Sequence, residues 1–216
     1  MIRKSVNFLL SLTVASGLIL SVGCGEKKDN GKTVTEDEMP YGATIQINKT
    51  DYPIAIEFDN RFVTEAEAEA IANYFYAVQT HDAELVQKAS YPPYITSLAT
   101  AGGFASIEEF ITSLDNAIAS DYLQADDYTY SYISVTSCTT EEDAEVYTYF
   151  NQLDQSLVTA ESECSSSKDI ISAIESRKLL SLEIICEIDG NERVLTNITG
   201  EQQVYVYTID GTAYVL

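Results

Sequence analysis

Few side chains in the sequence suit acid–base, thiol or metal chemistry. His81 is the only histidine of the 216 residues, which excludes any metal site or proton relay that needs two. It lies in a turn rich in helix-capping residues, which favours a structural role. The chain contains no G-x-S-x-G elbow for a serine nucleophile. We therefore expect no metal ion, no cofactor and no assignable catalytic residue.

Three cysteines lie far downstream of a fourth, Cys24. They are Cys138, Cys164 and Cys186, too widely spaced for a C-x-x-C zinc site. Their odd number permits one internal disulfide and one free thiol. Alternatively, all three stay reduced and pack as small apolar side chains. The sequence does not decide which.

Tyrosine is the most unusual feature of the composition, with 15 tyrosines and no tryptophan. A tyrosine side chain combines a flat apolar ring with a polar tip, which suits contact with a sugar ring, a peptide or another protein. Ordinary packing within a sheet explains the same residues. If the domain has a ligand pocket, we expect Tyr74, Tyr130 and Tyr147 to line it.

The amino-terminal residues predict export. Two basic residues precede an apolar run from Phe8 to Val22, which is too short to span a bilayer and is typical of a signal peptide. The segment Leu20 to Cys24 (LSVGC) resembles the lipobox of bacterial lipoproteins. That resemblance implies removal of residues 1–23, a diacylglyceryl thioether on Cys24, and a location on the outer face of the cytoplasmic membrane.

The segment after the lipobox predicts a tether. Residues 24–40 have almost no apolar content and mixed charge, so we expect a solvated chain with a reach of roughly 20 to 24 Å. Residues 41–216 are the right length for one domain. The formal net charge of −22 repels nucleic acid and anionic headgroups, so nucleic acid is excluded as a partner and the membrane is reached only through the lipid.

Sequence patterns that cap helices predict several helix starts. Three capping boxes pair Ser or Thr with Glu three residues later: Thr64 with Glu67, Ser106 with Glu109, and Thr139 with Glu142. Apolar residues then follow at helical spacing, to about Gln79, to about Ala119 and through Leu157. Asp82 is placed to cap a further short helix. The polar stretch from Thr159 to Lys168 predicts a loop.

The segment from Tyr128 to Cys138 predicts a strand. Strict alternation places its three tyrosines on one face and Ile133 and Val135 on the other. Both faces of such a strand would be covered, unless a bulge separates the two groups.

Two further regions predict strands. Tyr41 to Asn60 indicates two short extended segments, and alternation from Leu179 onward indicates an antiparallel meander with Tyr205 and Tyr207 on one face. The turns of the meander are Asp189-Gly190-Asn191 and Asp210-Gly211.

This order of elements predicts an α+β fold, with N-terminal helices packed on a curved antiparallel sheet in a cone or roll. The runs Asn73 to Asp82, Tyr91 to Tyr94 and Tyr205 to Leu216 resemble uncharacterised lipoproteins of Gram-positive anaerobes. Those proteins are similar to the nuclear transport factor 2-like, or cystatin-like, fold. The resemblance implies a pocket between helix and sheet that serves small apolar ligands, acid–base isomerisation or dehydration, or protein contact.

We therefore expect a lipid-anchored extracytoplasmic binding or interaction domain without catalytic activity. Its partner would be a small ligand, a peptide or an envelope protein. The alternative is a small acid–base enzyme of the isomerase or dehydratase kind. An enzyme predicts a carboxylate buried beside a tyrosine, whereas an interaction domain predicts a filled core and an exposed aromatic patch.

Overall fold

The computed structural model describes most of the chain beyond the predicted tether. The described residues are 45–47, 53–125, 127–141, 143, 146–164, 168–200 and 202–216. The predicted signal peptide (1–23) and tether (24–40), with Cys24, lie outside them. Among the helices that the structure describes, none combines the length and the apolar character needed to cross a membrane.

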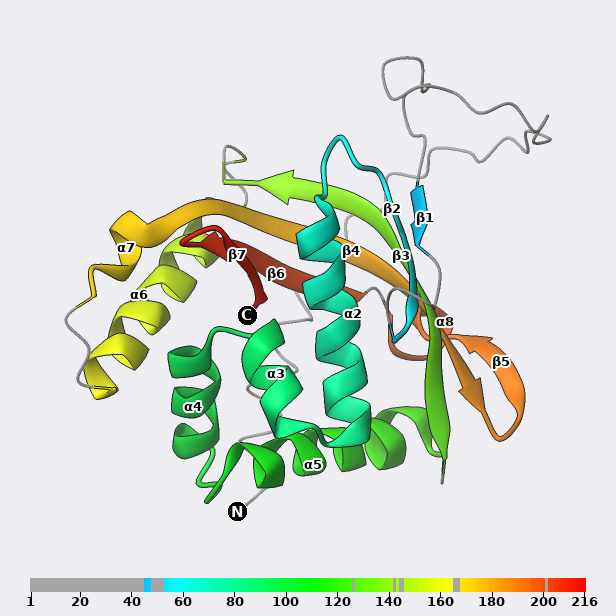
Figure 1. Cartoon of the computed structure of the whole chain (residues 1–216). Helices are drawn as coiled ribbons and strands as arrows, with labels where there is room; N and C mark the ends of the chain where they lie inside the picture. Colours follow the sequence, from blue (N-terminus) through cyan, green and yellow to red (C-terminus); the bar gives the residue numbers. More distant parts are fainter. Residues whose placement is uncertain are drawn as a thin grey trace.

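The described residues form one α+β arrangement around a strongly curled, seven-stranded sheet (Figure 1). The strands are β1 (Ile45–Ile47), β2 (Ala55–Phe58), β3 (Tyr128–Thr140), β4 (Ile174–Ile188), β5 (Asn191–Val194), β6 (Gln202–Ile209) and β7 (Thr212–Val215). Their order is β1-β2-β3-β4-β6-β7, and β5 pairs with β4.

The sheet is mixed, so the prediction of an antiparallel sheet is wrong at one pair. Strand β2 runs parallel to β3, with Ile56 opposite Ile133. Four helices separate these two strands in the chain, and a crossover of that length lets the second strand run in the same direction as the first. The other strand pairs are antiparallel.

The helices are α2 (Glu65–Thr80), α3 (Ala83–Ala89), α4 (Pro92–Ala101), α5 (Ile107–Ala117), α6 (Tyr147–Glu163), α7 (Ile170–Ala173) and α8 (Thr196–Thr199). A π-helical turn, η2 (Ile118–Leu123), continues α5. The capping box of Thr64 and Glu67 is confirmed, as is Asp82 as the cap of α3. Ser106 caps α5, although the Glu109 carboxylate accepts from the N–H of Ala105 instead of the N–H of Ser106.

Two predictions around α6 are wrong. Thr139 lies within β3 instead of capping a helix, and α6 starts only at Tyr147 without a side-chain cap. At its other end, α6 continues to Glu163 through the stretch predicted as a loop. Ala160 and Glu161 are both buried there, so packing holds a polar segment in the helix.

Strand β3 contains a bulge, which the sequence analysis gave as the alternative to a strand covered on both faces. Its register with β4 shifts between Tyr130 and Tyr132, and again after Val135. The first shift turns Tyr130 and Ile133 to the same face, where both are buried, and turns Tyr132 to the opposite face. The strict alternation predicted for this strand therefore fails, and the alternative with a bulge is confirmed.

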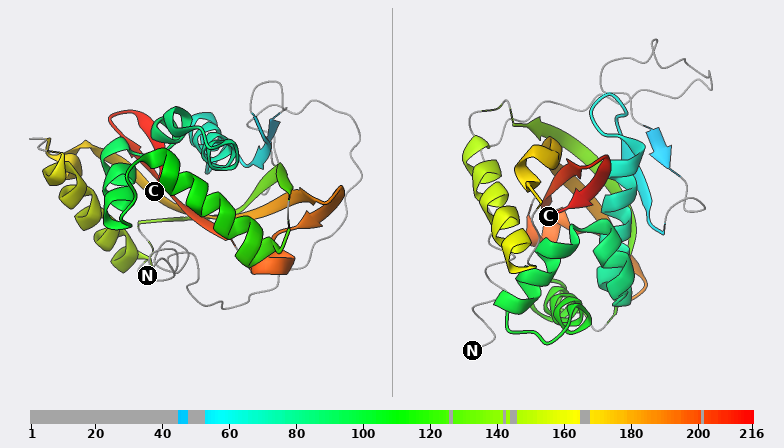
Figure 2. Two further views of the ribbon diagram at one scale, coloured as in Figure 1. Left: turned by 90° about the horizontal axis from the view of Figure 1, so that it is seen from below. Right: turned by 60° about the vertical axis from the view of Figure 1, so that its left-hand side comes forward.

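Strand β6 is covered on both faces (Figure 2). Val204 and Val206 pack into the cluster on the α2 side of the sheet, and Tyr205 and Tyr207 pack into the cluster on the α6 side. The Phe150 ring of α6 lies 5.9 Å and 6.0 Å from these two tyrosine rings. The shared face predicted for the two tyrosines is thus confirmed. The predicted turn between β6 and β7 is also confirmed.

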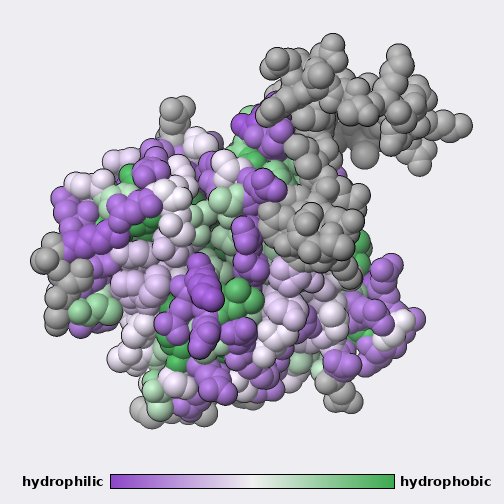
Figure 3. Space-filling model, viewed as in Figure 1, coloured by the Kyte–Doolittle hydropathy of each residue, from purple (hydrophilic) through white to green (hydrophobic). Residues whose placement is uncertain are grey.

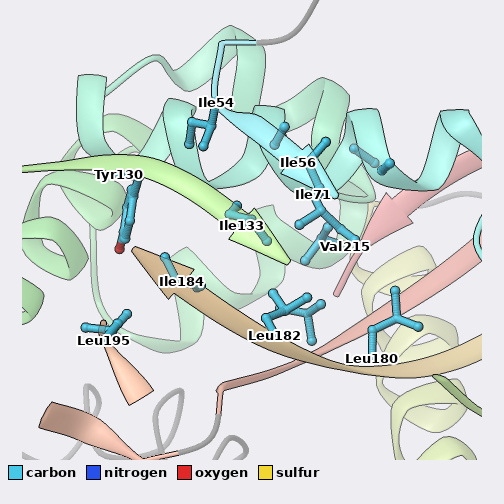
Figure 4. Packing of buried hydrophobic residues seen from close by; sticks show 14 of the residues in the cluster. Ile54, Ile56, Ile71, Tyr130, Ile133, Leu180, Leu182, Ile184, Leu195 and Val215 are labelled. Carbon is cyan, nitrogen blue, oxygen red and sulfur yellow. The ribbon is translucent and has the colours of Figure 1, made fainter. Parts of the chain in front are cut away.

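The α2 side of the sheet holds a closely packed aliphatic cluster (Figure 4). Its largest side chains with less than 2% exposed surface are Ile54, Ile56, Ile71, Ile133, Leu180, Leu182 and Ile184. Branched side chains from β2, β3 and β4 meet the Ala-rich face of α2 here. This cluster fixes where α2 presents its remaining residues, including Tyr74.

Candidate functional site

The structure brings together two of the three tyrosines predicted to line a pocket. Tyr74 of α2 and Tyr130 of β3 both contact Phe75 edge-to-face, with ring centroids 5.7 Å and 5.2 Å apart. Tyr147 is not part of this group. It is the first residue of α6 and is 58% exposed.

Tyr94 of α4 and Tyr205 of β6 belong together to the apolar cluster on the α6 side. Burial raises the pKa of Tyr94, and the phenols of Tyr74 and Tyr205 add to that shift. We call Tyr74, Tyr94, Tyr130 and Tyr205 the tyrosine junction. It lies where apolar clusters meet, because Tyr74 packs against both the α2-side cluster and a third cluster formed by α2 to α5.

Three hydroxyl groups of the junction have no hydrogen-bond partner in the described part of the chain: those of Tyr74, Tyr94 and Tyr205. None of the three oxygens is among the described polar atoms that are fully shielded from solvent. The Tyr74 side chain is half-buried, as is the neighbouring Phe75. Each of these hydroxyl oxygens therefore reaches solvent, where it can hydrogen-bond to water or to a bound molecule.

Burial dominates the chemistry of these phenols. It raises the pKa of Tyr74 and Tyr94 to about 12. Burial also raises the pKa of Tyr130, and the neighbouring Tyr128 hydroxyl partly offsets that shift. The phenols therefore stay protonated near neutral pH and act as hydrogen-bond donors.

A second arrangement adjoins the junction at the start of β3. Nε2 of His81 lies 2.9 Å from Oδ2 of Asp115, and the Tyr128 hydroxyl donates to Oδ1 of the same carboxylate at 2.6 Å. The Tyr128 ring in turn contacts Tyr130, with centroids 5.2 Å apart. A chain of polar groups thus runs from a side chain 38% exposed to a buried phenol.

Local structure holds this chain in place. His81 ends α2 in the left-handed region with φ 56°, and its N–H bonds back to the helix. The Gln79 amide donates to the carbonyl of Tyr128 at 2.5 Å and so ties α2 to β3. Asp115 orients the imidazole, and Nδ1 of His81 has no partner within the part of the chain that the structure describes. Such a histidine can transfer protons with a bound molecule.

Two other tyrosine hydroxyls hold α6 against its neighbours. Tyr207 donates to Asp154 at 3.2 Å, and Arg177 clamps that carboxylate with two bonds of 3.1 Å and 2.9 Å. Tyr91 donates to Glu161, a carboxylate only 4% exposed. These carboxylates are buried beside tyrosines, but each connects two packed elements and serves the fold.

Cys138, Cys164 and Cys186 are free thiols in the structure. Cys186 is buried, and desolvation raises its pKa to about 12, whereas Cys164 is exposed at the end of α6. Burial also raises the pKa of Cys138. No group of three or more potential metal ligands occurs among the residues that the structure describes.

Sequence reasoning missed Tyr94, Tyr205 and Asp115 as members of these sites. The alternation of β6 placed Tyr205 and Tyr207 on one face of the strand, but it did not show which helix packs against that face. Asp115 sits in an amphipathic helix among other polar residues, with no local pattern to single it out.

No protein-family model, curated protein or solved structure matches the chain.

Proposed function

We propose that this protein is a lipid-anchored binding domain on the outer face of a bacterial cytoplasmic membrane, with the tyrosine junction as its ligand site. The lipobox-like LSVGC segment ending at Cys24 supports the address. The proposal includes the resemblance to nuclear transport factor 2-like domains, since the helices pack on a curled sheet in both. The domain binds its ligand without transforming it.

One observation carries the binding role. The hydroxyls of Tyr74, Tyr94 and Tyr205 come from three different elements, yet none has a partner among the described residues. On the face shown in Figure 3, hydrophilic residues dominate and apolar residues form small separate spots.

Mass spectrometry of small molecules that copurify from the native host tests the ligand site. We expect a retained molecule that is lost from the double variant Tyr74→Phe/Tyr94→Phe and kept by Tyr147→Phe. The second variant removes an exposed hydroxyl outside the junction and serves as the matched control. Equal retention by both variants would place the ligand elsewhere.

Cell fractionation tests the anchor. The unaltered protein should sediment with membranes and carry fatty acid on Cys24, whereas Cys24→Ala should lose the acyl groups. A bilayer holds a doubly acylated protein stably. An unaltered protein that is free of fatty acid and released into the medium would refute the address.

The chain from His81 through Asp115 to Tyr128 favours a second candidate, a small acid–base enzyme. The distances of 2.9 Å and 2.6 Å provide an oriented imidazole beside the junction. In this case the retained molecule should exchange an acidic proton with deuterium oxide faster in the presence of protein. Exchange should disappear in His81→Gln and in Asp115→Asn while binding persists. Exchange at the uncatalysed rate would leave binding as the function.

A further inference from the structure

We propose that two copies of this chain associate through the outer surface of α6 and the adjoining helix α4. The two helices pack against each other at one end of the molecule (Figure 1, Figure 2). We call the exposed residues of α4, and those of α6 from Tyr147 to Ser162, the neutral face. This surface shares no residue with the tyrosine junction.

The neutral face contains no charged side chain. The sequence of α4, PPYITSLATA, has no Asp, Glu, Lys or Arg. In α6 the only exposed charged residue is the last one, Glu163, because Asp154 and Glu161 are both buried. These two carboxylates accept from Arg177 and Tyr91 inside the domain. The acidic residues of α6 are therefore used within the fold, and its outer surface stays uncharged.

The other main helices expose acidic residues. Glu65 and Glu69 are exposed on α2, Glu84 on α3, and Glu108 and Glu109 on α5. The whole chain has 34 acidic and 12 basic residues. An uncharged surface that extends over two adjoining helices thus stands out from the rest of this protein.

The absence of charge indicates what the face contacts. A basic partner gains more from the acidic surfaces, and a strongly acidic partner is repelled by the chain as a whole. A two-fold contact places a surface against its own copy, so every exposed charge near the axis would meet a like charge. Of the longer helices that the structure describes, α4 and α6 alone avoid this repulsion. A second copy of the chain therefore fits the neutral face.

The side chains of the face are also complementary to themselves. The amides of Asn151, Gln152 and Gln155 each donate and accept hydrogen bonds, so the same group on another copy can pair with them. Carboxylates, which only accept, lack this property. Tyr147 and Tyr149 add exposed rings with polar tips. Enrichment in tyrosine and depletion of charge are typical of the centre of a protein interface.

The size of the face indicates a weak, reversible dimer. Helix α6 has 17 residues, which corresponds to a length of about 25 Å. Two packed helices are about 20 Å wide. Two such surfaces bury on the order of 1,000 Å² in total, which is the lower limit of a specific interface. We therefore expect dissociation at roughly micromolar concentrations.

Sedimentation equilibrium of the full-length chain, in detergent micelles of matched density, tests the association. Over a roughly 100-fold range of protein concentration, the mass should rise from that of a monomer to that of a dimer. Added salt should strengthen the dimer, because it screens the repulsion between two chains of charge −22 and leaves an uncharged contact unchanged. A dimer that weakens with salt would mean that charged groups form the contact and would overturn the proposal.

A charge placed on the face tests its position. Gln155 is exposed at the middle of α6, so a two-fold contact brings the two carboxylates of Gln155→Glu near each other. The dimer should weaken at least about 10-fold. Gln124→Glu is the matched control, since it adds the same charge at an exposed residue that follows η2. That variant should change the dissociation constant by less than about 2-fold.

Removal of an exposed ring tests the contact itself. Tyr149→Ala should weaken the dimer about 5-fold, because Tyr149 is 41% exposed and its ring would become buried between the copies. Tyr76→Ala is the control, since Tyr76 on α2 is 37% exposed but lies outside the face, and it should leave the dimer unchanged. Circular dichroism checks that each variant is folded.

Two further results would overturn the proposal. The chain could remain monomeric at every concentration, in which case the neutral face does not bind its own copy. A dimer that Gln155→Glu weakens no more than Gln124→Glu would form through another surface. Neither result concerns the tyrosine junction, whose ligand is tested by copurification.

Discussion

Two groups of tyrosines in the described part of the chain differ in what their hydroxyls contact. Tyr91, Tyr128, Tyr132 and Tyr207 each donate to a carboxylate from another part of the chain. Tyr74, Tyr94 and Tyr205 have no such partner among the described residues. The paired tyrosines join elements of the fold, whereas the unpaired ones retain hydrogen-bonding capacity where the clusters meet.

Tyrosine hydroxyls therefore have two different roles within this domain. A hydrogen bond to a charged group stabilises a fold by about 1.5–3 kcal/mol, so each paired tyrosine is a structural contact. An unpaired phenol stabilises nothing through its hydroxyl. Since these oxygens reach solvent, the hydroxyls of Tyr74, Tyr94 and Tyr205 stay open to water or to a bound molecule. Each prediction below tests this division.

The largest effect should come from alkaline pH, which acts on both sets together. Burial is the main reason that the pKa values of Tyr74, Tyr91 and Tyr94 rise from 10 to about 12. The folded state thus holds these protons more tightly than the unfolded state does. The resulting stability is fully present below pH 10 and is lost as pH rises through 12, at about 1.4 kcal/mol per pKa unit for each group.

Urea unfolding at pH 9, 10.5 and 12 measures this loss, and absorbance at 295 nm follows ionisation. The titration of the native protein should lag behind that of the urea-unfolded chain. Coincident native and unfolded titrations would contradict the assignment of these phenols to the interior.

Asp154→Ala should have the next largest effect. It leaves Arg177, whose side chain is 16% exposed, without its two-bond partner and removes the acceptor of Tyr207. Breaking one side of a buried ion pair typically costs about 3–5 kcal/mol. Urea denaturation at pH 7 measures the loss. Glu141→Ala is the matched control, because Glu141 also contacts Arg177 but is 46% exposed, and it should cost at most about 1 kcal/mol.

Much of the fold was predictable from local sequence. The capping pair of Thr64 and Glu67, the Asp82 cap and the turn at Asp210-Gly211 act within a few residues, so their sequences determine their structures. The failures had non-local causes. Thr139 matches a helix cap, but pairing with Leu179 of β4 keeps it in a strand.

The candidate site was predictable only in part. Tyr74 and Tyr130, which we expected to line one pocket, lie together because a face of α2 meets a face of β3. Tyr147 has the same side chain, yet its position at the exposed start of α6 separates it from them. The pairing of His81 with Asp115 spans 34 residues and depends on how α5 packs beneath α2, which no local pattern encodes.

Tyr91→Phe should have an intermediate effect. It removes the hydroxyl that donates to Glu161, so a buried carboxylate loses a donor at a cost of about 1–3 kcal/mol. Ser97→Ala is the control, since Ser97 joins the same two helices through an exposed bond of 2.7 Å to Glu163. That variant should stay within about 0.5 kcal/mol of the unaltered protein in urea denaturation. Equal losses would show that the burial of Glu161 does not matter.

Tyr74→Phe should have the smallest effect and is the sharpest test of the division. The hydroxyl is hydrated in the unfolded chain, and in the folded protein it reaches solvent and has no partner in the described residues, so folding gains nothing from it. Removing it should leave the free energy of unfolding within about 0.5 kcal/mol or raise it slightly. Urea denaturation of Tyr74→Phe beside Tyr91→Phe measures the contrast. A loss as large as that of Tyr91→Phe would mean that Tyr74 has a structural partner, and the two sets of tyrosines would become one.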